Sequence, residues 1–350
     1  MAVEAWTRTA RGVFLEIRLI PVLLWSYTAV ALGTGLAFMD TGRLDAAWFG
    51  VALALGLLIQ GYTTHSVNEI YDWRSGTDRH VSARALSGGS KVLNMGLLDE
   101  RALWAIFWIA SGAVAVLAAL VGIARAPWLV LVIGLGYGVG VAYTVPPLAT
   151  SYRPFAGEWL GGFPGVLLAG VGAYGIQTLS LTWTAVVALS AHACVCTSML
   201  VMHGYLDAAA DAHAAPPKET VIHTLGPGGT VRYATAIAGA GALLYLVLAV
   251  SGHPEFLIGV GLTVPGVAVH AVTRLWDLRS VTRNELKIIQ LGIAGGTGTA
   301  VALAPPLWPL LPIAAAGYVA HLLAAAPPPH LARAWLPASA RSQGDRGTSK

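Results

Sequence analysis

The chain has 350 residues, of which 56% are hydrophobic and only 11% are charged. A soluble domain carries roughly 25% charged residues, so this composition excludes an ordinary soluble protein and predicts one that lies in lipid. The formal net charge of +4 is small, and it gives no reason to expect nucleic acid as a partner.

Apolar stretches recur along the chain, and most are long enough to cross a bilayer, which takes about 20 residues of helix. We expect nine spans, or ten if the last stretch also crosses: 14–38, 45–70, 100–124, 127–146, 157–176, 183–206, 230–251, 255–273, 285–304 and 307–325. The predicted fold is an all-α integral membrane protein, a bundle of nine or ten transmembrane helices in one domain over residues 1–326. Residues 327–350 are rich in Pro, Ser, Arg and Gly and are predicted to form a disordered tail.

Basic residues divide unevenly between the two ends of these spans. With the N-terminus in the cytoplasm, 15 Lys and Arg fall on the cytoplasmic side, against only Arg43 and Arg125 on the other. Short cytoplasmic loops of membrane proteins carry this excess. A tenth span would return the tail, which holds four more basic residues, to the same side. We therefore predict a multi-pass protein of the cell (inner or plasma) membrane, with its functional site facing the cytoplasm.

Two of the predicted spans end in carboxylates on that side. The second runs into "VNEIYDWRSGTDRH", and the sixth runs into "DAAAD". Asn68 and Asp72 are four residues apart, as are Asp207 and Asp211, so each pair shares one face of its helix. Mg²⁺ prefers oxygen ligands and uses one or two protein carboxylates together with phosphates and water. Two facing pairs could hold Mg²⁺ around a diphosphate, although a lone carboxylate in such a place is more often a solvated helix end.

The order of these motifs resembles the UbiA superfamily of intramembrane prenyltransferases, over nearly the whole membrane region. The nearest branch is the one that prenylates 1,4-dihydroxy-2-naphthoate for menaquinone. The matching residues beyond the two carboxylate motifs are Gly76 and Asp78, Gly88, Gly89 and Ser90, and, within "YTVPPLATSYRPFAGEW", Tyr143, Pro146, Pro147, Arg153, Gly157 and Glu158.

The resemblance implies Mg²⁺-dependent transfer of an isoprenyl group from an allylic diphosphate to an aromatic, dihydroxynaphthoate-like acceptor. The implied metal ligands and central catalytic residues are Asn68, Asp72, Asp78, Asp207 and Asp211, with Glu69 as an accessory ligand. The candidates for contacts with the substrates are Arg74, Arg84, Lys91, Arg153, Lys218, Tyr143, Tyr205 and His65. The alternative role for each basic residue is topological, for each tyrosine an interfacial anchor, and for the histidine packing.

Three positions depart from the family pattern. Glu69 stands where the family has Asp, Ala149 stands where a Lys often follows Pro-Pro-Leu, and Lys218 comes two residues late after the second motif. These departures concern the substrates more than the chemistry, and they are what a specialised relative, for instance in secondary metabolism, would show.

Two other functions stay open at this stage. One is a membrane terpene cyclase of the same fold, which has no acceptor, and the other, more remote, is a secondary transporter.

Overall fold

The structure, a computed structural model, describes residues 2–80, 89–275 and 277–325. Most of these residues are helical, and no β-strand occurs among them. The longer helices in chain order are α1 (Ala2–Glu16), α3 (Thr28–Thr41), α4 (Ala46–Gly56), α5 (His65–Ser75), α6 (Glu100–Ala124), α7 (Trp128–Ala142), α8 (Phe163–Thr178), α9 (Trp183–Ala212), α10 (Val221–Val250), α11 (Leu257–Val272), α12 (Leu278–Leu303) and α13 (Leu310–Ala325). Short α-, 3₁₀- or π-helical segments join them: α2 (Leu19–Val22), η1 (Leu23–Tyr27), η2 (Leu57–Thr64), η3 (Thr77–His80), η4 (Thr150–Tyr152), η5 (Gly157–Gly162), η6 (Pro254–Phe256) and η7 (Pro305–Leu307).

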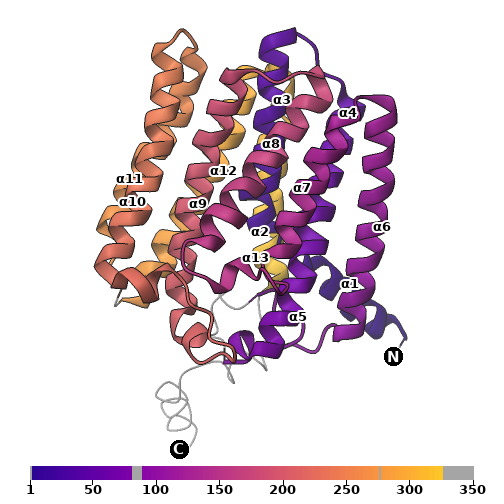
Figure 1. The fold of residues 1–350 in the computed structure, drawn as a ribbon, viewed down its shortest axis with the longest axis vertical. Helices are drawn as coiled ribbons and strands as arrows, with labels where there is room; N and C mark the ends of the chain where they lie inside the picture. The colour runs from indigo at the N-terminus through magenta and orange to yellow at the C-terminus, as the bar shows by residue number, and fades with distance from the viewer. Residues whose placement is uncertain (1, 81–88, 276, 326–350) are drawn as a thin grey trace, which may run out of the picture.

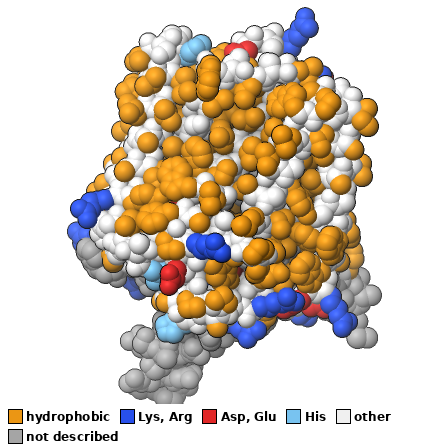
Figure 2. All heavy atoms as spheres, in the orientation of Figure 1, with side chains coloured by type: hydrophobic (Ala, Val, Ile, Leu, Met, Phe, Trp, Pro, Cys, Tyr) orange, Lys and Arg blue, Asp and Glu red, His pale blue; other side chains and the backbone are white. Residues whose placement is uncertain are grey.

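The long helices stand side by side in a single bundle, with α3 and α8 near its centre and α10, α11 and α6 at its edges (Figure 1). Nine helices of the described chain are long and apolar enough to cross a membrane, and the apolar helix α7 is shorter. Hydrophobic side chains cover most of the visible face, and Lys and Arg gather toward its lower end (Figure 2). The prediction of an all-α multi-pass membrane protein is confirmed.

Each of the ten predicted apolar stretches contains a helix, but the ends differ. The first apolar segment extends beyond the predicted bounds at both ends, over Trp6–Thr41, and it is divided between α1 and the helices that follow Arg18. The fourth is shorter: α7 has 15 residues and is about 22 Å long, less than the hydrocarbon core of about 30 Å. The predicted tail, residues 327–350, lies outside the described residues, so its disorder stays a prediction.

The central helices pack closely because small residues face one another. A Cβ atom on Gly33 of α3 would lie 2.2 Å from the carbonyl oxygen of Gly170 on α8. Two residues further along, on roughly the opposite side of α3, a Cβ atom on Gly35 would lie 2.9 Å from the carbonyl oxygen of Ala300 on α12. Close backbone approach of this kind is a common way to hold helices together where the solvent is as apolar as the side chains.

Two irregularities in the helices shape the region where the polar residues gather. Arg18 adopts a left-handed conformation, with φ 50°, and separates α1 from α2. The second and fifth spans each contain a π-helical stretch, η2 and η5, beside the same cavity. Such local widenings of a helix often accompany functional sites.

Candidate active site

The two carboxylate motifs meet at one end of the bundle. The Nζ atom of Lys218, in the loop after α9, lies 2.8 Å from Oδ2 of Asp72 on α5. The amide of Ala215 in the same loop donates a hydrogen bond of 2.8 Å to the carbonyl oxygen of Ser75. The loops that follow the second and sixth spans therefore lie together, as their shared face and charge predicted.

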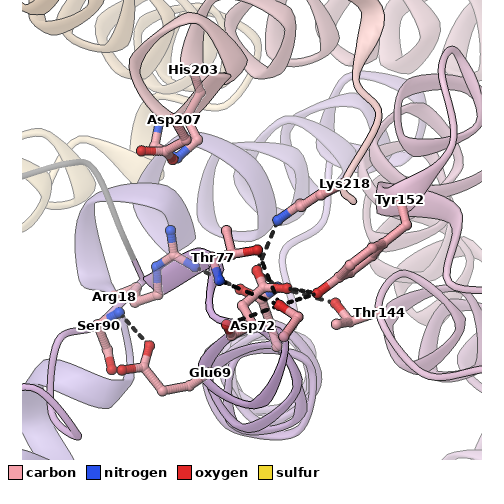
Figure 3. Close-up of polar contacts among 12 residues, drawn as sticks. Arg18, Glu69, Asp72, Thr77, Ser90, Thr144, Tyr152, His203, Asp207 and Lys218 are labelled. Carbon is pink, nitrogen blue, oxygen red and sulfur yellow. Dashed lines mark hydrogen bonds and ion pairs between the residues drawn. The ribbon is translucent and has the colours of Figure 1, made fainter. Parts of the chain in front are cut away.

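Asp72 is the most highly bonded carboxylate of the site (Figure 3). Its Oδ1 accepts a hydrogen bond of 2.7 Å from the hydroxyl of Tyr152, and its Oδ2 accepts from Asn68 Nδ2 at 2.9 Å and from Lys218. Asn68 is fixed in turn, because its Oδ1 accepts from Arg18 Nη1 at 3.1 Å and its Nδ2 donates to Thr144 Oγ1 at 3.1 Å. Three side chains thus hold Asp72 directly, and Arg18 and Thr144 hold it indirectly through Asn68.

Glu69 lies beside Asp72 but is turned toward a different set of partners. Its Oε2 accepts a hydrogen bond of 2.7 Å from the amide of Ser90, whose hydroxyl donates to Oε2 of the buried Glu16 at 2.7 Å. Gly89 makes this possible: its φ is 67°, and a Cβ there would lie 2.2 Å from Glu69 Oε2 and 2.6 Å from Asp78 Oδ2. The glycine of the predicted Gly-Gly-Ser stretch therefore admits two carboxylates to one place, since any larger residue would displace them.

The second motif faces the first across the cavity, with Asp207 and His203 opposite Asp72 (Figure 3). Asp207 Oδ2 lies 3.5 Å from Nε2 of His203, whose Nδ1 lies 2.8 Å from Oε1 of the fully buried Glu285 on α12. The backbone carbonyl of Asp211 accepts a hydrogen bond of 3.0 Å from the amide of Lys218. The same loop residue therefore contacts both motifs, one through its side chain and the other through its backbone.

A cavity of about 240 Å³ opens between the two motifs. It is lined by most of the residues that the sequence predicted for the site: His65, Asn68, Asp72, Asp78, Tyr143, Arg153, Asp207, Asp211 and Lys218. Arg18, His203 and Glu285 line it as well. Acidic, amide and basic side chains from distant parts of the sequence thus share one space, which continues into the apolar interior.

The other predicted site residues lie elsewhere. Arg74 is half exposed and forms an ion pair with Glu100, 2.8 Å away. Lys91 and Glu69 are buried beside the cavity rather than in its wall, and Tyr205 packs in the hydrophobic core with α12 and α13. Arg84 lies outside the described residues. Ala149, the position of the absent Lys, has a left-handed backbone conformation with φ 39° and does not line the cavity.

Burial and neighbouring charges decide which groups of the loops are ionised. Burial alone would lower the pKa of Lys218, but the carboxylates of Asp72 and Asp211 raise it well above its usual value, so this lysine stays protonated. Burial, followed by the charges of Asp72 and Glu69, raises the pKa of Asp78 well above its usual range. Burial lowers the pKa of Lys91 to about 8 despite the nearby carboxylates. An additional cation beside Asp78 would offset the repulsion between its carboxylate and those of Asp72 and Glu69.

Among residues 2–80, 89–275 and 277–325, three buried carboxylate oxygens of the site find no hydrogen-bond partner: Glu69 Oε1, Asp78 Oδ2 and Asp211 Oδ1. Buried polar atoms usually have partners, so unpaired carboxylate oxygens are suited to a cation. Within the described residues, no three His, Cys, Asp or Glu side chains gather closely enough to enclose a metal by themselves. The unpaired oxygens of Glu69, Asp78 and Asp211 fit Mg²⁺, which takes one or two carboxylates from a protein and completes its shell with phosphate and water.

Several residues of the site escaped the sequence analysis. Arg18 counted only as a topological charge, yet an arginine inside an apolar stretch, three residues before Pro21, is a sign of a broken helix with a polar purpose. Tyr152 directly precedes the predicted Arg153, and nothing in the sequence distinguished it from an interfacial tyrosine. Thr144 and Glu285 gave no local signal, because only the fold brings Thr144 to Asn68 and Glu285 to the cavity wall.

Comparison with known proteins places this geometry in a family. The sequence profile described as the UbiA prenyltransferase family matches residues 26–292. The 1,4-dihydroxy-2-naphthoate octaprenyltransferase of Bacillus subtilis (strain 168) is 33% identical over 138 residues, which is 39% of this chain. That alignment spans only 42% of the relative's length.

The fold is also similar to solved structures. A UbiA homologue from Archaeoglobus fulgidus, bound to GPP and Mg²⁺, superimposes with a TM-score of 0.62 at 15% identity, over 83% of this chain and 99% of that one. An apo UbiA homologue from Aeropyrum pernix K1 gives a TM-score of 0.54 at 17% identity, over 78% of this chain and 96% of that one. The profile match covers more than half of the sequence and the fold agrees with it, so this chain belongs to the UbiA prenyltransferase family.

Proposed function

We propose that this protein transfers an isoprenyl group from an allylic diphosphate to an electron-rich aromatic acceptor, with Mg²⁺ as cofactor. The observation that supports the proposal best is the position of Lys218. Its ammonium group pairs with Asp72 of the first motif, while its amide bonds to Asp211 of the second. A diphosphate between the two motifs would meet both the metal ligands and a protonated lysine.

The metal ligands in this proposal are the carboxylates that line the cavity, Asp72, Asp78, Asp207 and Asp211, together with the amide oxygen of Asn68. Glu69 lies just outside the wall and is an accessory ligand through its unpaired Oε1. Bound Mg²⁺ would neutralise the charge that develops on the departing pyrophosphate. Two solved structures support the choice, because a UbiA homologue from Archaeoglobus fulgidus has been solved with GPP and Mg²⁺ and also with DMAPP and Mg²⁺.

The chain's own cations would bind and orient the diphosphate. Lys218 donates hydrogen bonds as a point charge, whereas Arg18 and Arg153 offer guanidinium groups that can grip a phosphate with two bonds. Tyr152 keeps Asp72 oriented through its 2.7 Å hydrogen bond. When the bond from C1 to the diphosphate oxygen breaks, the electron pair leaves with pyrophosphate, and Tyr143 in the cavity wall can face the allylic cation.

The acceptor completes the reaction when one of its ring carbons forms a bond to C1. That carbon then loses a proton, or CO₂ if it carried a carboxylate. A dihydroxynaphthoate-like acceptor is supported by the Bacillus relative, named as a 1,4-dihydroxy-2-naphthoate octaprenyltransferase and 33% identical over 138 residues. The charge distribution of the loops supports a site that faces the cytoplasm from the cell membrane.

The direct test uses purified protein in lipid nanodiscs with Mg²⁺, a series of isoprenyl diphosphates, and dihydroxynaphthoate present or absent. We expect pyrophosphate release and a product whose mass joins prenyl group and acceptor, both abolished by EDTA. Asp40→Asn is a matched control, because Asp40 is a carboxylate at the end of α3, where it accepts a 2.6 Å hydrogen bond from Tyr174; this variant should keep its activity.

Two outcomes would contradict the proposal. Pyrophosphate release that does not depend on an acceptor and yields a prenyl hydrocarbon would identify a membrane terpene cyclase instead. No pyrophosphate release from any donor, in protein that remains folded, would leave both enzyme functions without support.

A further inference from the structure

A fully buried carboxylate reaches the site from a helix that carries neither motif. Glu285 lies about two turns from the start of α12, has an exposed fraction of 0% and lines the cavity. Arg283 and Lys287, two residues before and after it, are exposed. A carboxylate in a buried place is costly unless a hydrogen bond and an opposite charge compensate it. The partner of Glu285 therefore indicates what this residue does.

That partner is His203 on α9. The Nδ1 atom of His203 lies 2.8 Å from Oε1 of Glu285. An ionised carboxylate accepts hydrogen bonds but donates none, so Nδ1 carries the hydrogen, and this bond fixes the orientation of the ring. The two residues are 82 positions apart in the sequence, and no step of the proposed reaction uses either side chain.

The second nitrogen of this ring faces the second carboxylate motif. The Nε2 atom of His203 lies 3.5 Å from Oδ2 of Asp207, one turn further along α9 (Figure 3). With a carboxylate at each nitrogen, the charged form of the imidazole is favoured, and in that form both nitrogens donate. One ring thus connects a buried carboxylate of α12 with a carboxylate of the proposed metal site.

These three side chains do not form a metal site of their own. Among residues 2–80, 89–275 and 277–325, no group of three His, Cys, Asp or Glu side chains is placed to hold an ion. In known metal sites, a carboxylate outside the ligand set commonly orients a histidine that binds the metal. Here the histidine itself lies outside the ligand set, and it orients a carboxylate.

We propose that Glu285 is a positioning residue, which holds Asp207 in the direction of the bound metal through His203. This inference rests on the proposed function, because it takes Asp207 to be a ligand of Mg²⁺. Neither Glu285 nor His203 has to touch the metal or the diphosphate. Loss of such an outer partner typically weakens metal binding by about 10- to 100-fold. A substitution at Glu285 should therefore change the Mg²⁺ requirement of the protein as well as its stability.

The experiment measures metal binding without turnover, in the full-length protein in lipid nanodiscs. Mg²⁺ is titrated at a saturating concentration of geranyl thiolodiphosphate, an unreactive analogue of an allylic diphosphate, and thermal stabilisation reports the bound ion. We expect Glu285→Met to raise the Mg²⁺ concentration for half-maximal stabilisation by roughly 10- to 100-fold. His203→Leu should raise it by a similar factor.

A double variant separates positioning from stability. Each single substitution leaves a buried polar partner unpaired and should lower the thermal midpoint, whereas Glu285→Met with His203→Leu replaces both partners by apolar groups and should recover most of it. The Mg²⁺ requirement of the double variant should stay raised, but no further than in His203→Leu alone.

Two results of the double variant would overturn the proposal. If the Mg²⁺ requirement recovers together with the thermal midpoint, the pair only ties α9 to α12. If the requirement rises well beyond that of His203→Leu, Glu285 acts on the metal without His203.

The matched control is Asn284→Ala. Asn284 is the buried neighbour of Glu285 on α12, donates a hydrogen bond of 3.0 Å to Thr273 Oγ1, and does not line the cavity. Its substitution should lower the thermal midpoint and leave the Mg²⁺ requirement unchanged. An unchanged requirement in Glu285→Met, beside normal stabilisation of the unsubstituted protein, would overturn the positioning role alone. Absence of Mg²⁺-dependent stabilisation in the unsubstituted protein would contradict the proposed function as well.

Discussion

The two carboxylate motifs have the same spacing and face the same cavity, yet the fold treats them differently. In the first, each oxygen of Asp72 accepts a hydrogen bond, and a lysine pairs with it. In the second, the buried Oδ1 of Asp211 has no hydrogen-bond partner among the described residues, as is also true of Glu69 Oε1 and Asp78 Oδ2 in the first, while Asp207 lies near His203. The comparison teaches that Asp72 is held in place before any ligand arrives, whereas Asp211 keeps an oxygen that the proposed metal ion would pair.

The largest effect is expected from a substitution that removes the hydrogen-bonded carboxylate of Asp72. Asp72→Asn removes the charge that pairs with the buried Lys218, and loss of one partner of a buried pair costs about 3–5 kcal/mol. We expect a large fall in thermal stability in Mg²⁺-free detergent and a loss of prenyl transfer of at least about 100-fold. The double variant Asp72→Asn, Lys218→Met should recover most of the stability but none of the activity. Recovery of activity would show that neither charge takes part in the reaction.

The next effect concerns ligand removal. Mg²⁺ with an isoprenyl diphosphate, at about 100 times its dissociation constant, should stabilise the folded protein by about 2.7 kcal/mol. EDTA should reverse the shift, and Ca²⁺ at the same concentration is the ionic-strength control, since it prefers a larger and looser shell. Equal stabilisation by diphosphate without any divalent ion would argue that the basic residues alone bind it.

A smaller effect of opposite sign is expected in the second motif. Asp211→Asn removes a buried negative charge that lacks a partner at one oxygen, so without Mg²⁺ it should raise stability by about 1 kcal/mol. The same variant should lose most of the stabilisation by Mg²⁺ and diphosphate. If it lowers stability as much as Asp72→Asn does, the contrast between the two motifs is wrong.

The smallest effect is predicted for the surface. Arg74→Gln breaks an ion pair with Glu100 whose arginine side chain is 50% exposed, and exposed pairs contribute about 0–1 kcal/mol. We expect stability to change by less than about 0.5 kcal/mol and the KM for diphosphate to change less than twofold. A tenfold rise in that KM would restore Arg74 to the list of phosphate ligands.

The sequence predicts the fold well because hydropathy is a local property. Ten apolar stretches become helices, and the charge count places Asp72 and Asp207 at the same end. Spacing along a helix likewise identifies the residues that share a face. The sequence does not predict the partners of these residues, since Arg18 and Glu285 reach the cavity, and Thr144 reaches Asn68, from other parts of the chain. A lysine's direction depends on its loop: Lys218 points to the first motif, while Arg74, two residues after Asp72, points away from the cavity.

The apolar end of the cavity, at Ile176, also bears on whether ions could pass through the bundle. A polar-mouthed channel through a membrane conducts ions unless an apolar or fixed barrier blocks it. Here water and protons that enter among the carboxylates meet buried apolar side chains, and beyond them the contacts of Arg125 and Gln177. The charged end of the cavity is therefore separated from the opposite end of the bundle by apolar side chains, which would oppose the passage of ions.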